Sequence, residues 1–384
     1  MRPEVQARVL ERLVAAIDQP RAEVAPRSTR LSVSRYLDEG ELAREREVLF
    51  ARRPIVVAHA SELAEVGAFR TDMLGDVPLL ITRAQDGVHV FVNACRHRGA
   101  RLVDAPAGCS KLLTCPYHAW TYRPDGRLFR VPGEDTFDAL DHAALGLREL
   151  PSEVRHGLVW AQLDGQLDVA SFLGPVLDDD LEAFDLAGHV ALGRTDRVVS
   201  ANWKLVMDAF AEGYHLSSLH SKSLARFFLE VSVLDDCAPH VRQVGARKTL
   251  LEVKGDASRA DLRRDTTVFY DVFPNTVLVF HPDWLSALTV FPLDVDHVRV
   301  VHRMLAPDGP RDEDASQRLA RSFAHIDEQV FLKEDLAIAE SIQSTLASGA
   351  NEHVLLGGLE EGMRLFHAAR DAALEAALEA ARQE

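Results

Sequence analysis

Two pairs of metal-binding residue types lie close together in the first third of the chain. One residue separates Cys95 from His97, and two residues separate Cys115 from His118. Two thiolates and two imidazoles on short loops are the ligands of a [2Fe–2S] cluster in which histidines replace cysteines on one iron. A structural zinc site uses the same residue types, but common zinc modules pair Cys with Cys and His with His. The mixed pairs favour the cluster, and with it electron transfer.

The residues around these pairs predict tight turns at the ends of short strands. Gly99 and Pro116 suit turns whose backbone N–H groups can point at sulfur. Hydrogen bonds of this kind stabilise a reduced cluster and tune its potential. The apolar and β-branched runs over 87–93 and 112–114 predict the strands that lead into the turns.

A second group of possible ligands, Glu212-x-x-His215-x-x-x-x-His220, lies in the second half of the chain. Two neutral imidazoles and one carboxylate bind mononuclear Fe(II) in non-haem oxygenases and leave one face open to O₂ and substrate. The five-residue spacing of the histidines does not fit one face of a straight α-helix, so we expect an irregular turn near Ser217 and Ser218. Alone, the pattern is weakly specific, because most such histidines are ordinary core or surface residues.

The carboxylate that would complete this site is expected in the helix after residue 313. Its apolar stripe is predicted to contain Phe331, Ile338, Ile342 and Leu346. Asp335 falls inside the stripe, where an unpaired carboxylate is costly unless a metal binds it. Asp327 shares the stripe and competes for the role, whereas Glu334 and Glu340 are predicted to be solvated.

Together, these motifs resemble those of the large (alpha) subunits of Rieske non-haem iron oxygenases, which hydroxylate rings or remove methyl groups. The resemblance spans roughly residues 35–370. It rests on C-R-H-R-G at 95–99, C-P-Y-H-A-W at 115–120, Asn-Trp-Lys at 202–204 and E-D-x-x-x-x-E-x-x-Q at 334–343. The chain departs from the family at Ala119, where Gly is usual, and at Ala209, where many relatives have Asn.

The resemblance implies a role for each candidate ligand. The Rieske [2Fe–2S] cluster would be bound by Cys95, His97, Cys115 and His118, and one mononuclear Fe(II) by His215, His220 and Asp335. By the same resemblance, Glu212 is a catalytic residue but not a ligand. It would link His215 to His118 of a neighbouring subunit by charge-assisted hydrogen bonds and couple cluster reduction to the reactivity of the iron.

The implied fold is α+β. Helices over 1–50 would pack on the catalytic domain, an all-β Rieske domain would follow over 51–160, and a catalytic helix-grip domain with a curved antiparallel sheet and flanking helices would occupy 161–384. The hydrophobic pattern predicts a helix over 3–19, a second over 38–49 and final helices over about 313–348 and 358–382. It predicts strands over 54–58, 78–82, 89–93, 157–163, 268–273, 276–281, 285–291 and 298–306, and a hairpin over 121–128.

The expected function is that of a terminal oxygenase component. It would use O₂ and electrons from a separate NAD(P)H-dependent reductase or ferredoxin to hydroxylate a small aromatic or alicyclic compound, as in aromatic hydrocarbon catabolism. No G-x-G-x-x-G follows a strand, so the reductase must be another protein. The family's assembly implies a homotrimer. Alternatives are oxidative N- or O-demethylation, including that of a quaternary amine held by aromatic faces, a Rieske electron carrier without oxygen chemistry, and a zinc-bearing scaffold.

The composition of the chain indicates which kinds of partner it can bind and in which cellular compartment it is expected. The net charge of −16 argues against nucleic acid. Cys109 and Cys237 are expected to be reduced thiols, and with no signal peptide or membrane-length apolar run we expect a cytoplasmic protein. The candidate substrate-pocket residues are Phe210, Leu216, Leu219, Phe269, Phe273, Phe280, Trp284 and Phe291.

Overall fold

The structure is a computed structural model, and it describes residues 1–19, 24, 27–253, 256–307, 309–310 and 312–382. The chain divides into two compact units, one of Met1–Leu49 with Leu173–Glu384 and one of Phe50–Phe172. Helices and antiparallel sheets are both extensive, which confirms the predicted α+β class. The predicted domain boundaries at residues 50 and 160 stay predictions. No described helix combines the length and apolar character that a membrane span requires.

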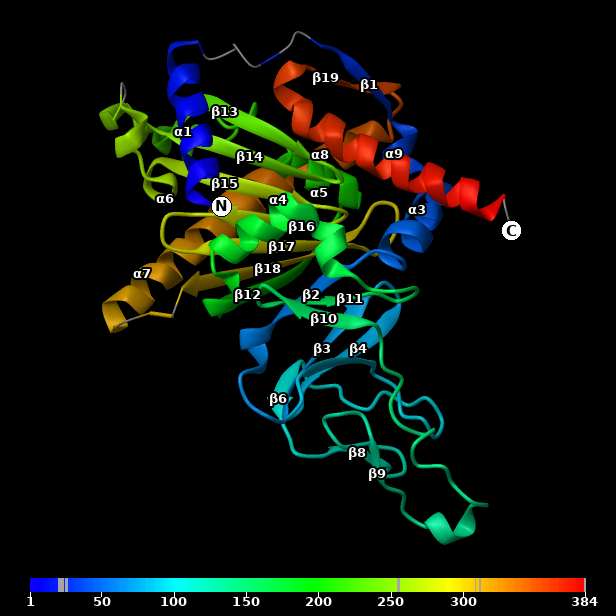
Figure 1. The fold of residues 1–384 in the computed structure, drawn as a ribbon. Helices are drawn as coiled ribbons and strands as arrows, with labels where there is room; N and C mark the ends of the chain where they lie inside the picture. The colour runs from blue at the N-terminus through cyan, green and yellow to red at the C-terminus, as the bar shows by residue number, and fades with distance from the viewer. Residues whose placement is uncertain (20–23, 25–26, 254–255, 308, 311, 383–384) are drawn as a thin grey trace. The chain divides into compact units, whose positions relative to one another are not determined.

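The smaller unit is built from three antiparallel sheets (Figure 1). Their strand orders are β10–β11–β2, β5–β4–β3–β6 and β7–β8–β9. The strands are β2 Ile55–His59, β3 Ala68–Leu74, β4 Val77–Arg83, β5 Val88–Val92, β6 Ala107–Cys109, β7 Leu113–Thr114, β8 Thr121–Tyr122, β9 Leu128–Arg130, β10 Ser152–Arg155 and β11 Leu158–Ala161. The predicted strands of this region and the hairpin over 121–128 are confirmed, with ends shifted by one or two residues.

The hydrophobic core of the smaller unit contains two of the candidate ligands. Cys95 and Cys115 are buried in one cluster with Phe91, Trp120 and Tyr122. The two loops that carry the thiols are therefore fixed by the same packed interior, although they are separated in sequence.

The larger unit is built around a seven-stranded antiparallel sheet of order β12–β18–β17–β16–β15–β14–β13. Its strands are β12 His189–Val199, β13 Phe228–Cys237, β14 His240–Arg247, β15 Thr266–Val272, β16 Thr276–Phe280, β17 Leu285–Pro292 and β18 Val298–Pro307. The strands β15 to β18 match the predicted ones, whereas β12 to β14 were not predicted. These three strands carry charged residues such as Asp196, Asp235 and Arg242. They pair with Arg299, Arg12 and Asp180 of other elements, and Asp235 also pairs with Arg242.

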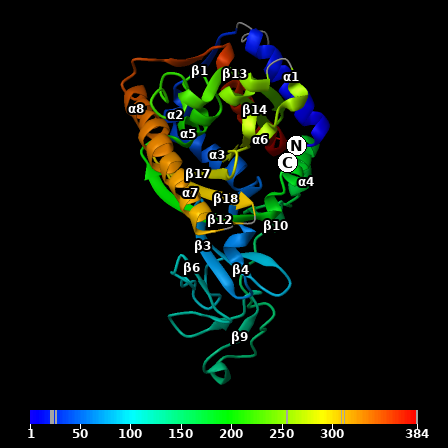
Figure 2. The same ribbon diagram turned by 90° about the vertical axis from the view of Figure 1, so that its left-hand side faces the viewer.

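Helices cover the sheet on two sides. Figure 2 shows α7 and α8 along one side and α4 on the other. The helices are α1 Pro3–Asp18, α2 Ser34–Leu37, α3 Glu39–Glu45, α4 Val169–Ala183, α5 Trp203–Phe210, α6 Leu262–Asp265, α7 Glu313–Ala324, α8 Ala337–Leu346 and α9 Glu361–Ala381. A small sheet pairs β1 Thr29–Ser32 with β19 His353–Leu356. The predicted first helix and the two predicted final helices are confirmed.

The two faces of the sheet have different environments because side chains alternate along each strand. On one face, Arg242 of β14 and Tyr270 of β15 hydrogen-bond to Asp180 of α4, at 2.6 and 2.8 Å. On the other face, Gln243, Gly245 and Arg247 of β14 and Thr267 and Phe269 of β15 line a cavity. The sheet therefore forms one wall of the candidate site.

The helix that carries the predicted acidic ligand is not regular. Residues His325–Leu336 between α7 and α8 form a π-helix, in which each N–H bonds to the carbonyl five residues back. The extra residue per turn rotates the following side chains. Ile338 and Ile342 are therefore 41% and 37% exposed, and their predicted place in the buried stripe is wrong. Asp327 and Asp335 are buried.

Candidate metal centres

The two cysteine loops of the smaller unit have matching backbones. In the first, Cys95 N–H donates to the carbonyl of Ala100 and Gly99 N–H donates to that of Cys95, at 2.8 and 2.9 Å. In the second, Cys115 N–H donates to Trp120 and Ala119 N–H to Cys115, at 2.8 and 3.0 Å. Each loop also contains one left-handed residue, Gly99 at φ 76° and Ala119 at φ 57°. The two loops are thus equivalent turns, as the sequence predicts.

The four predicted cluster ligands lie close together, and the two histidines are more exposed to solvent than the two cysteines. Both thiols are buried, while His97 is half-buried and His118 is exposed. The two imidazole rings lie 4.7 Å apart, and His97 stacks on Trp120 at 4.8 Å. Two inner sulfurs and two outer imidazoles fit a [2Fe–2S] cluster whose histidine-bound iron lies toward the surface.

Tyr122 contacts the first cysteine in a way that sequence reasoning missed. Its hydroxyl oxygen lies 3.4 Å from Sγ of Cys95 and accepts the N–H of Arg96 at 3.0 Å. Because that oxygen already accepts one hydrogen bond, its own proton is free to point at the sulfur. The spacing of Tyr122, seven residues after Cys115, gives no sequence signal for this contact.

In the larger unit, the two histidines lie in a turn region and not on a helix. The helix α5 ends at Phe210, and turns occupy 214–224. The N–H groups of Ser218 and Leu219 donate to the carbonyl of His215, at 3.0 and 2.8 Å. The predicted irregular turn near Ser217 is therefore confirmed, and it is longer than expected.

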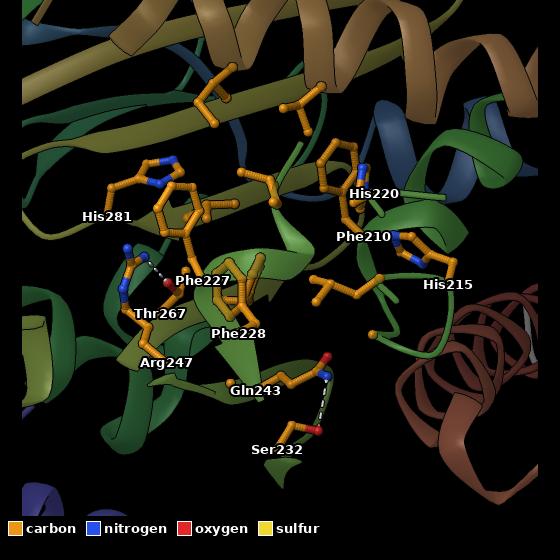
Figure 3. Close-up of a pocket in the computed structure, with 18 of the residues that line it drawn as sticks. Phe210, His215, His220, Phe227, Phe228, Ser232, Gln243, Arg247, Thr267 and His281 are labelled. Atoms are coloured by element: carbon orange, nitrogen blue, oxygen red, sulfur yellow. Dashed lines mark hydrogen bonds between the residues drawn. The ribbon is translucent and has the colours of Figure 1, made fainter. Parts of the chain in front are cut away.

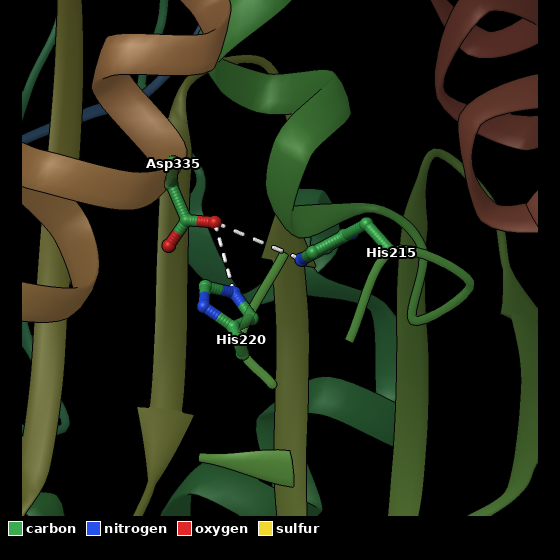
Figure 4. A group of neighbouring side chains, drawn as sticks. All are labelled: His215, His220 and Asp335. Atoms are coloured by element: carbon green, nitrogen blue, oxygen red, sulfur yellow. Dashed lines mark ion pairs between the residues drawn. The ribbon is translucent and has the colours of Figure 1, made fainter. Parts of the chain in front are cut away.

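These turns bring His215 and His220 next to Asp335 of the π-helix (Figure 4). One ligand atom from each residue can be chosen so that all three lie within 4.8 Å of one another. Oδ1 of Asp335 is 3.0 Å from Nε2 of His220 and 3.7 Å from Nε2 of His215. The two imidazoles and the carboxylate therefore converge on one point, as in a facial triad.

Each histidine donates a hydrogen bond from its other ring nitrogen, Nδ1, to a glutamate. Nδ1 of His220 lies 2.6 Å from Glu334, and Nδ1 of His215 is hydrogen-bonded to Glu212. The predicted solvation of Glu334 is wrong, because its side chain is only 13% exposed and also accepts from Ser223 at 2.6 Å. A carboxylate at Nδ1 leaves Nε2 of a neutral imidazole as the electron-pair donor, which is the arrangement of metal-binding histidines.

The electrostatics of this group fit a bound cation. With both Nε2 atoms as electron-pair donors, the buried Oδ1 of Asp335 faces them without a hydrogen-bond partner among the described residues. Burial raises the pKa of Asp335. Burial alone would lower the pKa of His220, but the negative charges of Asp335 and Glu334, with the hydrogen bond to Glu334, raise it. Two imidazole nitrogens and one carboxylate oxygen that face the same point, in surroundings that favour positive charge, are suited to bind a divalent metal such as Fe(II).

The competing carboxylate, Asp327, has other partners. It accepts from Thr195 at 2.7 Å, from Nδ1 of His302 at 2.8 Å and from Arg197 at 2.6 Å. Burial would raise its pKa, but these hydrogen bonds lower it to about 2. Asp327 thus stays ionised in a complete network of its own, and the geometry favours Asp335 as the third ligand.

Other residues of the sequence motifs connect the start of α5, which leads to the two histidines, with α8, which follows Asp335. Asn202 caps α5 by accepting from Lys204 N–H at 3.0 Å. Its own N–H donates to Gln343 at 2.9 Å, and Ser200 N–H donates to Glu340 at 2.9 Å. The two ends of the E-D-x-x-x-x-E-x-x-Q segment therefore differ: one end carries the candidate ligand Asp335, and the other attaches to α5.

A buried ion cluster fixes α5 from its other side. Glu45 of α3 accepts from the indole of Trp203 at 2.7 Å, from Lys204 at 2.8 Å and from Arg370 at 2.6 Å. A buried charge is tolerated when it is paired and fully hydrogen-bonded, as here. The Asn-Trp-Lys motif is thus structural, since it orients the helix that leads to the histidines.

A cavity of about 660 Å³ adjoins this metal centre (Figure 3). Of the predicted pocket residues, Phe210, Leu216, Phe269 and Trp284 line it. Leu219, Phe273, Phe280 and Phe291 are not among its lining residues. Sequence reasoning missed Phe227, Phe228, Arg247 and His281. Phe227 directly precedes β13, Phe228 and Arg247 lie in β13 and β14, and His281 directly follows β16. None of them stood out in the sequence.

Comparison with known families agrees with both centres. Residues 53–151 match the family described as Rieske [2Fe-2S] domain, and residues 184–376 match the one described as ring hydroxylating alpha subunit (catalytic domain). The chain belongs to the ring-hydroxylating alpha-subunit family. It therefore has both the [2Fe–2S] domain and the mononuclear-iron catalytic domain of these Rieske oxygenases.

Similar proteins act on chemically different substrates. The chain is 32% identical over 216 residues to the glycine betaine monooxygenase oxygenase subunit of Chromohalobacter salexigens, covering 56% of this chain and 48% of that protein. It is 30% identical over 234 residues to the biphenyl 2,3-dioxygenase subunit alpha of Rhodococcus jostii, covering 59% and 51%. Both alignments thus span about half the length of the relative.

The fold is shared with solved Rieske oxygenases. The quaternary ammonium Rieske monooxygenase CntA superposes with a TM-score of 0.77 over 90% of this chain and 95% of that chain, at 24% identity. At this identity the likeness establishes the fold alone, and it does not transfer a substrate.

Proposed function

We propose that this protein is the terminal oxygenase component of a multicomponent system that hydroxylates a small organic compound. The observation that carries the proposal is the convergence of His215, His220 and Asp335 beside an apolar cavity, in a chain that also holds the Cys95–His118 ligand set. A cluster at the first centre supplies single electrons, and an iron at the second activates O₂ beside the substrate.

The residues of the chain prepare both centres for these tasks. Glu212 and Glu334 hold the imidazoles with Nε2 directed at the metal, and Phe210 and Leu216 form apolar walls next to them. The surface position of His118 supports an electron-transfer contact with another subunit. We place Glu212 in that contact, between His215 and His118 of a neighbouring subunit in a homotrimer. The electrons come from a separate ferredoxin or NAD(P)H-dependent reductase.

The first experiment combines spectroscopy with metal analysis. Dithionite-reduced protein should give a Rieske-type electron paramagnetic resonance signal, with about three irons and two acid-labile sulfides per chain. With NADH and a generic reductase, O₂ consumption should then depend on an added organic substrate. Asp335→Ala should abolish product and leave the cluster spectrum unchanged. Bound zinc with no signal would exclude an oxygenase, and unchanged activity in Asp335→Ala would assign the third ligand elsewhere.

Oxidative demethylation is the second candidate, because the glycine betaine monooxygenase subunit is among the similar proteins. The two reactions start from the same centres and differ in the carbon that is oxidised. Release of formaldehyde in step with O₂ consumption would identify demethylation, whereas a hydroxylated product that keeps every carbon would identify ring or side-chain hydroxylation.

A further inference from the structure

One arginine lines the cavity without an acidic partner. Arg247, at the end of β14, is half-buried, and its guanidinium donates to the hydroxyl of Thr267 at 3.3 Å. It forms no ion pair with any carboxylate in the part of the chain that the structure describes. Among the described residues that line the cavity, Arg247 is also the only Lys or Arg.

The surroundings of this guanidinium are mostly apolar. Its central carbon lies 5.3 Å from the ring centre of Phe228 and 5.8 Å from that of Phe227. Burial lowers the pKa of Arg247, and the charge of Asp283, which is exposed, only partly opposes this. A guanidinium that is partly removed from water gains most from a planar anion, to which it can donate two parallel hydrogen bonds.

The neighbouring histidine adds no second positive charge. Burial lowers the pKa of His281 to about 3, so its ring is neutral near pH 7. Its Nε2 is hydrogen-bonded to Ser286 at 3.2 Å, and Ser286 to His302 at 3.0 Å. Among the described residues that line this end of the cavity, Arg247 is therefore the one positive charge, and Arg226 lies outside the lining and is exposed. A single lining charge matches a monoanion better than a dianion.

The aromatic rings at this end are poorly suited to a cationic ligand. A quaternary ammonium binds over the faces of aromatic rings. Phe227 already lies near two guanidinium groups, that of Arg226 at 4.7 Å and that of Arg247 at 5.8 Å. The half-buried charge of Arg247 would repel a cation placed there, whereas the charge of Arg226, which is exposed, is screened by solvent. In the described parts of the chain, four acidic residues also line the cavity. Glu212 and Asp335 belong to the candidate metal centre at the other end, and Glu230 and Asp283 are exposed, so their charges are screened by solvent.

Arg247 and the metal centre lie at different ends of the cavity. Figure 3 shows Arg247 and His281 on one side of the rings of Phe227 and Phe228, and His215 and His220 on the other. A ligand that reaches from one end to the other must therefore have an apolar body. The cavity volume of about 660 Å³ is ample for a small organic molecule.

We propose that the substrate is an organic monocarboxylate with an uncharged apolar body, that Arg247 binds its carboxylate, and that the carbon to be oxidised lies at the other end, beside His215 and His220. This deepens the proposed function and rests on it for the oxidation step. The binding step depends only on Arg247 and the shape of the cavity. Thr267 has a positioning role, since its hydroxyl holds the guanidinium in place.

The test is calorimetric titration of the purified holoprotein without O₂ or reductant. The probes are benzoate, 3-phenylpropionate, hexanoate and decanoate, each compared with its neutral amide and with a trimethylammonium analogue of similar length. At least one acid should bind about tenfold or more tightly than its amide, as expected for a charge-assisted hydrogen-bonded pair. In Arg247→Met this preference should fall to within about twofold.

Arg226→Met is the matched control, because it removes the same charge near the same ring from a residue that does not line the cavity. It should keep the preference for the acid. If Arg247→Met does not fold, Arg247→Gln replaces it, and the acid-to-amide ratio of the unchanged protein remains a test without any variant. The proposal is overturned if no acid is preferred over its amide, if the trimethylammonium series binds best, or if Arg247→Met keeps the preference.

The design separates this inference from the proposed function. Arg247-dependent binding of an acid that is never oxidised when reductase and O₂ are supplied would support the inference and contradict the oxygenase. O₂-dependent oxidation of a neutral or cationic compound, with no preference for acids, would support the oxygenase and contradict the inference.

Discussion

Glu334 accepts a hydrogen bond from Nδ1 of His220 at 2.6 Å. The residue next to Glu334 in sequence, Asp335, faces the other nitrogen of the same ring at 3.0 Å. Adjacent residues of one π-helix therefore fix both nitrogens of His220. Since Glu212 does the same for Nδ1 of His215, each histidine of the centre has its own orienting carboxylate.

Replacing Glu334 should weaken metal binding without unfolding the protein. In Glu334→Gln, the amide can still accept from Nδ1 but no longer raises the basicity of the imidazole, so we expect a loss of about 10- to 100-fold in affinity for Fe(II). Competition with a colorimetric chelator measures this. Glu328→Gln, an exposed position on the same π-helix, should bind iron normally. Equal affinities in the two variants would remove the orienting role of Glu334.

Replacing Glu212 should separate metal binding from turnover. In Glu212→Gln, iron affinity should fall as in Glu334→Gln, so the variant is measured with Fe(II) in excess and both centres filled. Turnover should still fall by about tenfold or more, because an uncharged amide would no longer hold His215 and, in the proposed trimer, His118 of a neighbouring subunit by charge-assisted bonds. Single-turnover product formation by the pre-reduced protein measures the effect. Glu230→Gln, an exposed acidic position at the cavity, is the comparison. Normal turnover in Glu212→Gln would contradict a bridge between subunits.

The strained loop of the second cysteine pair should gain stability from glycine. Ala119 has φ 57°, a left-handed conformation that disfavours a side chain. Part of the relief is offset by the greater freedom of glycine in the unfolded chain, so Ala119→Gly should stabilise the smaller unit by about 0.5 to 1 kcal/mol. Urea-induced bleaching of the cluster measures this.

The equivalent position in the first loop offers the reverse experiment. Gly99 has φ 76°, and no atom lies within 4 Å of a β-carbon built there, so Gly99→Ala adds strain without a clash. It should destabilise the same unit by about 1 kcal/mol. Shifts of the same sign in the two variants would contradict the equivalence of the loops.

Tyr122→Phe should lower the reduction potential of the cluster. The lost hydroxyl lies 3.4 Å from Sγ of Cys95, and a donor to sulfur stabilises the reduced state, which carries more negative charge. A hydrogen bond of about 0.5 to 1.5 kcal/mol corresponds to about 20 to 60 mV for one electron. Spectroelectrochemical titration of both proteins measures the shift. An unchanged or higher potential would show that the hydroxyl does not donate to the sulfur.

His281 should make folding stability depend on pH just below neutrality. Its pKa is held at about 3 by burial, against an ordinary value of 6.5. Between these values the unfolded chain binds a proton that the folded protein does not, so stability falls as the pH falls through 6.5. From pH 7.5 to 5.5 the loss is about 1.4 kcal/mol. Urea unfolding at both pH values should show a loss in the natural protein that is smaller by this amount in His281→Phe, where the buried His302, whose pKa is also lowered, still contributes. Equal pH dependence in the two would contradict the burial of a neutral ring at His281.

The metal-binding residue types were readable from the sequence because each carries its own chemistry at short spacing. Cys95, His97, Cys115 and His118 lie on two local turns, and the structure brings them together. The residues that orient them or complete the site were harder to predict. The sequences around Glu334 and Arg247 contain no motif that marks either residue as part of a site. Only the tertiary structure shows that Glu334 contacts His220 and that Arg247 lines the cavity.

Strand prediction succeeded where the hydrophobic pattern was continuous and failed where charged residues interrupted it. The strands β15 to β18 are almost entirely buried, are mostly apolar and were predicted, although β18 also contains Arg299 and Arg303. The strand β14 carries Arg242 and Arg247 on opposite faces, each with a separate environment. A helical period of 3.6 residues also placed Ile338 and Ile342 wrongly, since the π-helix before them has a longer turn.

The π-helix over His325–Leu336 makes this part of the chain intolerant of changes in length. A π turn contains about one residue more than an α turn, so deletion of a residue there would shorten one turn and change the register of the side chains after it. Each residue of an α-helix turns by about 100°, and Asp335 would consequently rotate away from His215 and His220. Substitutions that preserve length leave this geometry intact. During divergence, this segment should therefore accumulate exchanges of residue type, while insertions and deletions are confined to the loops before α7 and after α8.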